Sequence, residues 1–287
     1  MQHKSSDSGI WDDRNFLSEK KNDVVDILGM PMNRITIEEL LRISNQCITS
    51  RKQLLLGVAN VAKVVNARND SLLRESLDRA DLVVADGLPL VWLSRLLGTP
   101  LPERIAGIDV MYELLREAND KNYSVYFLGA RLEVLQQVVE IVRRDYPGIH
   151  VAGYRDGYFA KGEEEAVAEE IRDSRADIVF VAISPPKKEI FLNKWRELMA
   201  VPICHGVGGS FDVFAGFTRR APRWMQNSGL EWLYRLIQEP RRMWKRYLVT
   251  NTVFLELCFR AVLRARFGRL FHRPANLAAY DVHDPKV

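Results

Sequence analysis

Short apolar runs alternate with longer amphipathic stretches from about residue 50 to residue 212. In the longer stretches, apolar residues recur every three or four positions, which is the period of a helix. Unbroken apolar runs are typical of strands that are covered on both faces, as in a parallel sheet. We therefore predict an α/β fold with a Rossmann-like parallel sheet flanked by helices. The predicted strands lie within residues 53–60, 82–86, 124–130, 149–159, 177–184 and 201–212.

The two ends of the chain follow other patterns. Residues 1–22 are polar, which predicts a flexible N-terminal segment, and a strand and turn follow it. Thr36 and Glu39 form a capping-box signature, which predicts that a helix begins there. We expect residues 61–80 to form one helix. Only the helical period is left from residue 222 onward, so we place an α/β domain at 23–218 and a helical appendage at 219–287.

Composition restricts the class of protein. Of the 287 residues, 47% are apolar, which is enough for a sizeable core. The three cysteines show no C-x-x-C spacing, which argues against a disulfide scaffold or a zinc ribbon and fits a reducing compartment. The first residues lack the apolar region of a secretory signal, and residues 247–259 are too short to span a bilayer. We therefore expect a cytoplasmic protein.

The net charge of +4 is unevenly distributed. Residues 1–218 carry a net charge of −5, whereas residues 219–273 carry 13 basic and 3 acidic residues. A basic appendage on an acidic body indicates an anionic partner. Interleaved aromatic residues favour a membrane-surface helix, and the alternative is a solvated helix whose aromatic side chains pack on the body. Nucleic acid is a weaker candidate because no known recognition motif accompanies the charge.

Ligands of open parallel sheets bind at the carboxyl ends of the strands. Backbone amides near Gly129 and Gly208 could hold a phosphate there, and the alternative is that these glycines only form tight turns. No G-x-G-x-x-G or P-loop motif occurs, which disfavours hydride transfer and P-loop chemistry. The predicted strand ends present Asn60, Asp86, Gly87, Gly129 and residues 206–210.

Asp86 directly follows the apolar run 82–85. A carboxylate at a strand end can accept a proton from a substrate hydroxyl, and the alternative is a helix N-cap. Asp212 can likewise cap a helix or hold a ribose or base. His205 lies within an apolar run, so we interpret it as a core histidine with a hydrogen-bond partner. The chain has no D-x-D motif, no histidines at metal-ligand spacing and no G-x-S-x-G, so we predict neither a metal site nor a serine triad.

Several segments together resemble the WecG/TagA/CpsF family of bacterial glycosyltransferases, which is glycosyltransferase family 26. The resemblance covers about residues 25–248, and the order and number of the motifs make it specific. It is carried by ADGLPLVW (85–92), ERIAGIDV (103–110), VYFLGA (125–130), GYRDGYF (153–159), SPPKKE (184–189), GVGGSFDVFAG (206–216), RRAP (219–222) and GLEWLYRLIQEPRR (229–242).

The resemblance implies an inverting transferase that uses no metal or other cofactor. Such an enzyme moves a hexose-type sugar from a UDP-sugar to a polyprenyl-diphosphate-linked sugar on the cytoplasmic face of the cell membrane. Its appendage closes over the site and docks on the membrane. By this resemblance Asp86 is the catalytic base, Asp212 lies in the nucleotide pocket, and Arg235 and Arg242 stabilise the diphosphate.

We therefore expect Asp86 as the catalytic residue and a wider set of substrate-binding residues around it. That set comprises Asn60, Gly87, Gly129, Tyr154, Lys187, Lys188, Glu189, Gly208, Gly209, Asp212, Arg220, Arg235, Arg242 and Lys245.

Three positions depart from the family pattern. Val58 stands where the family often has threonine, Lys188 where it has glutamine, and Lys245 where it has arginine. The departures alter hydrogen bonding on the donor side and favour members that transfer glucose in exopolysaccharide synthesis. The alternative function is a non-catalytic, membrane-associated protein that binds nucleotide sugars. The protein could form a homo-oligomer, and the sequence does not decide its oligomeric state.

Overall fold

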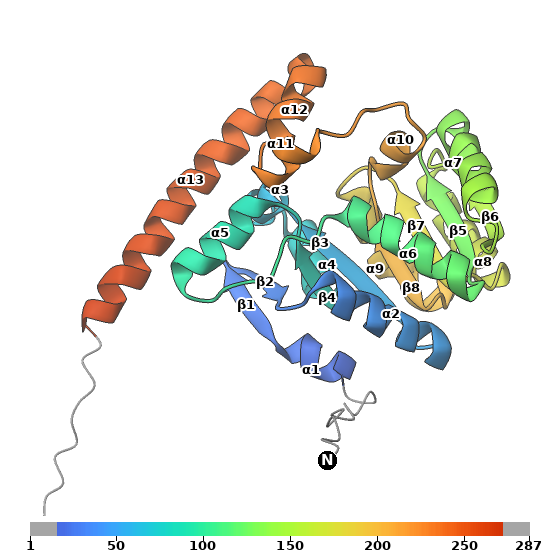
Figure 1. The fold of residues 1–287 in the computed structure, drawn as a ribbon, viewed down its shortest axis with the longest axis horizontal. Helices are drawn as coiled ribbons and strands as arrows, with labels where there is room; N and C mark the ends of the chain where they lie inside the picture. Colours follow the sequence, from blue (N-terminus) through green and yellow to red (C-terminus); the bar gives the residue numbers. More distant parts are fainter. Residues whose placement is uncertain (1–15, 272–287) are drawn as a thin grey trace, which may run out of the picture.

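The computed structural model describes residues 16–271, with the side chains of Arg242 and of residues 267–271 left out (Figure 1). Its centre is a parallel sheet with the strand order β4-β3-β8-β7-β5-β6, which confirms the predicted fold class. The strands are β3 (Leu54–Ala59), β4 (Leu82–Ala85), β5 (Ser124–Gly129), β6 (His150–Arg155), β7 (Ile178–Ala182) and β8 (Ile203–Gly206).

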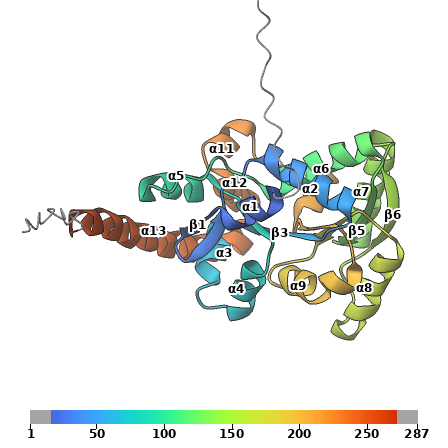
Figure 2. The same ribbon diagram turned by 90° about the horizontal axis from the view of Figure 1, so that it is seen from below.

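Helices cover both faces of the sheet, so the domain has three layers (Figure 2). Successive strand residues belong to different hydrophobic cores: Phe127 packs under α2, α6 and α7, whereas its neighbours Tyr126 and Leu128 pack toward α8 and α9. This alternation explains why the strands are apolar at every position. The first layer consists of α2 (Ile37–Ser50), α6 (Gly107–Lys121) and α7 (Leu132–Asp145), and the second of α3 (Val61–Asn66), α4 (Ser71–Asp78), α8 (Glu164–Asp173) and α9 (Lys187–Met199).

The first described residues form regular structure. Residues 16–22, which the sequence pattern placed in a flexible segment, form helix α1 (Phe16–Asn22). The Phe16 ring is buried, and the Arg42 guanidinium lies 3.5 Å from its centroid. An antiparallel hairpin of β1 (Val24–Ile27) and β2 (Met30–Asn33) follows where one strand and a turn were predicted. Residues 1–15 of the predicted flexible segment lie outside the described residues.

The N-terminal caps show where local chemistry sets helix boundaries. The predicted capping box of Thr36 and Glu39 is confirmed at the start of α2. The prediction of one helix over residues 61–80 is wrong. The chain instead breaks between α3 and α4, because the Asp70 side chain accepts a hydrogen bond from Leu73 N and starts a new helix.

The C-terminal part packs along one side of the domain. Its last helix, α13 (Pro240–Phe271), contacts α3, α12 (Glu231–Gln238) and α5 (Leu88–Leu97). Phe254 of α13 is buried in the core that also contains Val64 and Leu90. Within residues 16–271, no helix combines the length and the apolar character needed to cross a bilayer. The remaining short helices are η1 (Lys161–Glu163), α10 (Ser210–Phe214) and α11 (Arg223–Asn227).

Candidate active site

The carboxyl ends of the parallel strands lie at one edge of the sheet, and the predicted site residues follow those ends. Asn60 follows β3, and its side chain caps α3 by accepting a hydrogen bond from Lys63 N at 3.1 Å. Gly129 ends β5 and Gly206 ends β8. Tyr154 lies on β6, at the opposite edge of the sheet from β4, so the fold does not bring it next to Asp86.

Asp86 follows β4 and is only half-buried, so its side chain is not sealed in the interior. Its backbone N–H donates to Ala59 O at 2.7 Å. The N-cap alternative for Asp86 is wrong, because Gly87 with φ 135° occupies the N-cap position of α5. No described residue donates a hydrogen bond to the Asp86 carboxylate, which leaves that group available for chemistry.

Burial raises the pKa of Asp86 above the ordinary value of an aspartic acid. Arg104, Arg235 and Lys63 lower the pKa of the carboxyl by attraction, whereas Glu231 raises it by repulsion. Among these, only Arg235 was predicted as a neighbour of Asp86 from the sequence. Asp86 therefore lies in a mainly cationic environment that the C-terminal helix α12 helps to form.

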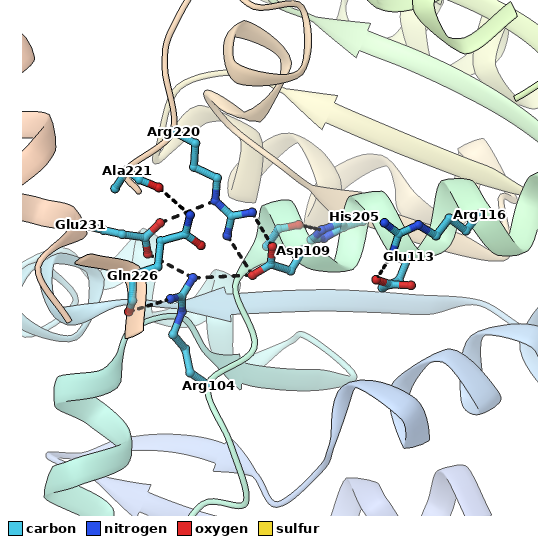
Figure 3. Close-up of polar contacts among 10 residues, drawn as sticks. Arg104, Asp109, Glu113, Arg116, His205, Arg220, Ala221, Gln226 and Glu231 are labelled. Carbon is cyan, nitrogen blue, oxygen red and sulfur yellow. Dashed lines mark hydrogen bonds and ion pairs between the residues drawn. The ribbon is translucent and has the colours of Figure 1, made fainter. Parts of the chain in front are cut away.

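Arg104, Asp109, Arg220 and Glu231 form a cluster that we call the arginine–carboxylate cluster (Figure 3). The Arg104 guanidinium lies 3.0 Å from the Glu231 carboxylate and 3.6 Å from that of Asp109. Arg220 binds Asp109 through two hydrogen bonds of 2.6 and 2.9 Å. The cluster joins the connection before α6, the first turn of α6, the segment after α10, and α12.

Sequence analysis assigned Arg220 to the substrate, but the structure pairs it with Asp109. It did not predict Arg104, Asp109 or Glu231 as site residues. Arg104 and Asp109 lie in the quoted motif 103–110 and Glu231 in the motif 229–242, so the resemblance contained a signal for them. The ion pairs of Arg104 with Glu231 and of Asp109 with Arg220 join residues more than 100 positions apart, which no local pattern indicates.

A second group of charges lies beneath the strand ends. Lys188 and Glu189 were predicted in a loop, but α9 begins at Lys187 and turns both side chains into the protein. Lys63 Nζ lies 2.9 Å from Glu189 Oε1, and Lys188 Nζ lies 3.5 Å from the same oxygen. We call Lys63, Lys188 and Glu189 the buried lysine network. Lys187 is exposed.

The glycines at the site have different roles. Gly129 has φ 117°, and a Cβ there would lie 2.6 Å from the backbone of Ala182, so the tight turn alone requires glycine. Gly208 has φ 57° and lies over the Lys188 ammonium. A Cβ at Gly209 would meet no atom within 4 Å, so this part of the loop is open. Asp212 is half-buried in the first turn of α10.

The remaining predicted site residues lie in the C-terminal helices. Arg235 is exposed on α12, within electrostatic reach of Asp86. Lys245 is exposed on α13, and no described contact links it to Asp86. The side chain of Arg242 lies outside the described part of the structure.

A polar cleft of ≈ 790 Å³ opens beside the arginine–carboxylate cluster. Its walls come from α6, from the segment after α10, and from α11 and α12. The lining residues that carry charge or a hydroxyl include Asp109, Tyr112, Arg116, Arg219, Arg223 and Tyr234. The cleft is large enough for a sugar phosphate.

His205 is a core residue, as the sequence indicated. Its Nε2 lies 2.9 Å from Gly107 O, and burial lowers the pKa of the imidazole to about 4. In the part of the chain that the structure describes, no three His, Cys, Asp or Glu side chains gather in a way that could hold a metal ion.

The fold and the site define an α/β protein with one carboxylate and several cations at the carboxyl edge of its sheet, which is the edge where ligands of open parallel sheets bind. Residues 25–268 match the family described as the Glycosyl transferase WecG/TagA/CpsF family. Because this match covers most of the sequence, the chain belongs to that family, which confirms the resemblance.

Two curated relatives carry the name N-acetylglucosaminyldiphosphoundecaprenol N-acetyl-beta-D-mannosaminyltransferase. The relative from Bacillus spizizenii strain W23 is 44% identical over 172 residues, and the one from Bacillus subtilis strain 168 is 43% identical over 172 residues. In both cases the match covers 60% of this chain and 66% of the relative, which is just under two thirds of the relative's length.

Proposed function

We propose that the chain is an inverting glycosyltransferase of bacterial surface polysaccharide or exopolysaccharide synthesis. It transfers a hexose-type sugar from a UDP-sugar to a hydroxyl of a polyprenyl-diphosphate-linked sugar. Membership in the family supports the kind of reaction, and the relatives' names support a polyprenyl-diphosphate acceptor. The observation that carries the proposal is the half-buried Asp86 carboxylate at a strand end, which accepts no hydrogen bond from the described residues and lies in a mainly cationic environment.

In the proposed step the acceptor oxygen attacks the anomeric carbon, and the bond from that carbon to the UDP oxygen breaks. Asp86 takes the proton of the acceptor hydroxyl, and UDP leaves with the electron pair. A positioned general base contributes about 10²–10⁴-fold to the rate. Because an ionised carboxylate is needed, the step requires Asp86 to be deprotonated before the acceptor reacts.

The leaving diphosphate needs cations, since charge develops on its oxygen as the bond breaks. We assign this role to Arg235, Arg242 and Lys188. The bidentate pair with Asp109 makes Arg220 a structural residue in this arrangement. The proposed reaction uses no metal or other cofactor, and Gly208, Gly209 and Asp212 surround the nucleotide.

The appendage is proposed to hold the protein on the cytoplasmic face of the membrane as a peripheral protein. Exposed basic side chains of α13 alternate with exposed apolar ones such as Trp244, Leu255 and Phe259. Such a helix lies at the headgroup boundary of a bilayer. Among the side chains of α13 that the structure describes, the exposed basic ones are Arg241, Lys245, Arg246, Arg260, Arg264 and Arg266.

A donor screen tests the proposal. The full chain is incubated with a short-chain lipid-diphosphate sugar and, in turn, UDP-glucose, UDP-N-acetylglucosamine and UDP-N-acetylmannosamine. Val58 and Lys188 favour glucose, whereas the names of the relatives favour N-acetylmannosamine. We expect mass spectrometry to show one sugar added to the acceptor, with one UDP released for each sugar.

The screen also separates the two candidate functions. UDP binding without UDP release from any donor would contradict the transferase and support the non-catalytic nucleotide-sugar-binding protein. The observation that supports this second candidate is the departure of Val58 and Lys188 from the family pattern on the donor side.

A further inference from the structure

The buried lysine network places three ionisable side chains where the protein is nearly closed to water. The exposed fractions of Lys63, Lys188 and Glu189 are 7%, 6% and 7%. Ionised groups lose most of their hydration in such a place, so they persist only when they are paired and hydrogen-bonded. One carboxylate serves two ammonium groups here, which leaves one positive charge in excess.

Each lysine is also bound to the end of a strand. Lys63 Nζ donates a hydrogen bond to Val58 O of β3, and Lys188 Nζ donates one to Gly206 O of β8 at 3.1 Å. The two strands are neighbours in the sheet. The network therefore ties together the neighbouring strands β3 and β8 at the edge where the proposed site lies.

The same backbone holds Asp86. The carbonyl that follows Val58 belongs to Ala59, and it accepts the hydrogen bond from Asp86 N. Two consecutive carbonyl groups at the end of β3 are thus bound from two sides: that of Val58 accepts from Lys63 Nζ, and that of Ala59 accepts from Asp86 N. On the other side, a Cβ at Gly208 would lie 3.4 Å from the Lys188 ammonium, so the network also supports the glycine loop.

The excess positive charge of the network is matched by Asp86. The carboxylate lies within electrostatic reach of both Lys63 and Lys188. The other charged groups that act on Asp86 are Arg104, Glu231 and Arg235, and the imidazole of His205 lies near both lysines. Because burial and the pKa of about 4 keep His205 neutral above that pH, it adds no charge in the range of interest.

We propose that Lys63 and Glu189 are positioning residues of the transfer reaction, which together with Lys188 fix the end of β3 beside Asp86 and supply the cations that face its carboxylate. This inference rests on the proposed function, since it concerns the base of that reaction. Neither residue needs to touch the substrate.

Loss of a positive charge and loss of the negative charge of the network should shift the pKa values of two different groups in opposite directions. Loss of the Lys63 charge removes an attraction from Asp86, so the pKa of the base rises. Burial and Lys63 already lower the pKa of Lys188 to about 8, and Glu189 acts against them. Loss of the Glu189 charge therefore lowers the pKa of Lys188 further. The first change affects the acidic limb of a pH profile and the second the basic limb.

The test uses the isosteric or hydrogen-bonding variants Lys63→Gln and Glu189→Gln of the full chain. For Lys63→Gln we expect the acidic limb of kcat/KM to move up by about 0.5–1 pH unit. For Glu189→Gln we expect the basic limb to move down by a similar amount. Lys63→Arg keeps the charge and should restore the acidic limb. Lys194→Met, on the exposed side of α9, is the matched control and should move neither limb.

A second measurement reads Asp86 without turnover. Carboxyl ¹³C NMR of aspartate-labelled protein gives the titration of Asp86, assigned by the signal that Asp86→Asn removes. If the wild-type protein transfers no sugar, the proposed function fails while this titration still tests the network. An Asp86 titration at the wild-type position in folded Lys63→Gln, or limbs that stay in place while activity falls, would overturn the inference.

Discussion

At the scale of single residues, the burial that places Asp86 for its proposed role as a base also has a cost in stability. Burial raises its pKa in the folded state, so the folded protein binds a proton at Asp86 more readily than the unfolded chain does. The ionised carboxylate therefore lowers the free energy of unfolding at neutral pH, and this loss disappears as the pH falls below the pKa of both states.

Asp86→Asn should abolish the base and remove this cost. We expect turnover to fall about 10²–10⁴-fold, with UDP affinity nearly unchanged, and the melting temperature to rise at pH 7 but not at pH 3. UDP release, calorimetric titration with UDP and thermal unfolding at both pH values measure these effects. Full activity of Asp86→Asn would remove Asp86 from the mechanism.

Gly129 and Gly209 form a matched pair of glycine substitutions. Gly129→Ala places a methyl group against Ala182 at a positive φ and should lower the free energy of unfolding by about 2 kcal/mol or more. Gly209→Ala meets open space at φ −75°, so it should leave stability unchanged but raise KM for the donor. Chemical denaturation and initial-rate kinetics distinguish the two. An unchanged KM in Gly209→Ala would show that the loop does not contact the donor.

At the scale of elements, the arginine–carboxylate cluster holds α12 against the domain. Glu231 is its only member on α12, and it meets Arg104, whose side chain is largely buried. We expect Glu231→Gln to weaken the docking of α12 by about 1–3 kcal/mol, because it breaks a partly buried ion pair, whose loss costs more than that of an exposed pair and less than that of a fully buried one. Faster hydrogen exchange in α12 measures the effect.

The exposed pair of Glu256 and Arg260 within α13 provides the control. Glu256→Gln should change the free energy of unfolding by less than about 0.5 kcal/mol, because exposed pairs on one helix contribute little. Equal exchange rates in α12 of Glu231→Gln and of the wild type would contradict the role of the cluster.

The sequence predicted the elements well where the signal is local. Strands such as β7 are apolar throughout because both faces are covered, and Thr36 with Glu39 starts α2 through contacts within one turn. Predictions failed where distant residues decide. Residues 16–22 are mostly polar, but Phe16 is buried and lies against the Arg42 guanidinium, far away in sequence. The buried lysine network likewise forms only because the fold brings Lys63 of α3 next to Glu189 of α9.

The same reason limits the prediction of the site. Asp86 was predicted as a site residue because it stands directly after a strand and matches the base that the resemblance implies, whereas the arginines of the appendage came from the resemblance alone. Arg104 and Glu231 were missed because their ion pair crosses more than 100 residues of sequence. Lys188 was predicted in an open loop, whereas the first turn of α9 turns its side chain into the protein.

At the scale of the whole molecule, the excess of basic residues belongs to the C-terminal part of the chain, which includes α13. This helix lies on one side of the molecule, whereas α7 and α8 lie at the far end (Figure 1). We expect the variant Lys245→Gln/Arg246→Gln/Arg260→Gln/Arg264→Gln to bind anionic vesicles about 1,000-fold more weakly, since each cation near an anionic surface contributes about 1 kcal/mol. Sedimentation with vesicles that contain anionic lipid, at two salt concentrations, measures the binding.

Replacement of Arg131, Arg143, Arg144 and Arg172 by glutamine removes the same number of exposed charges from the other end of the molecule. This control should bind vesicles almost as the wild type does. Equal losses in both variants would show that net charge, rather than a docking surface on α13, governs the attraction.

The packing of α13 on α3 has a mechanical consequence. α3 is six residues long, begins next to the cap Asn60, and carries Lys63 in its first turn. One short helix therefore lies between the long C-terminal helix and the proposed reacting groups, beside the contacts that α13 makes with α5 and α12. If a bilayer holds α13, its curvature or lateral tension would act on the proposed catalytic edge through α3 and through the neighbouring α5 and α12, so the shape of the bilayer itself would influence the pace of sugar transfer.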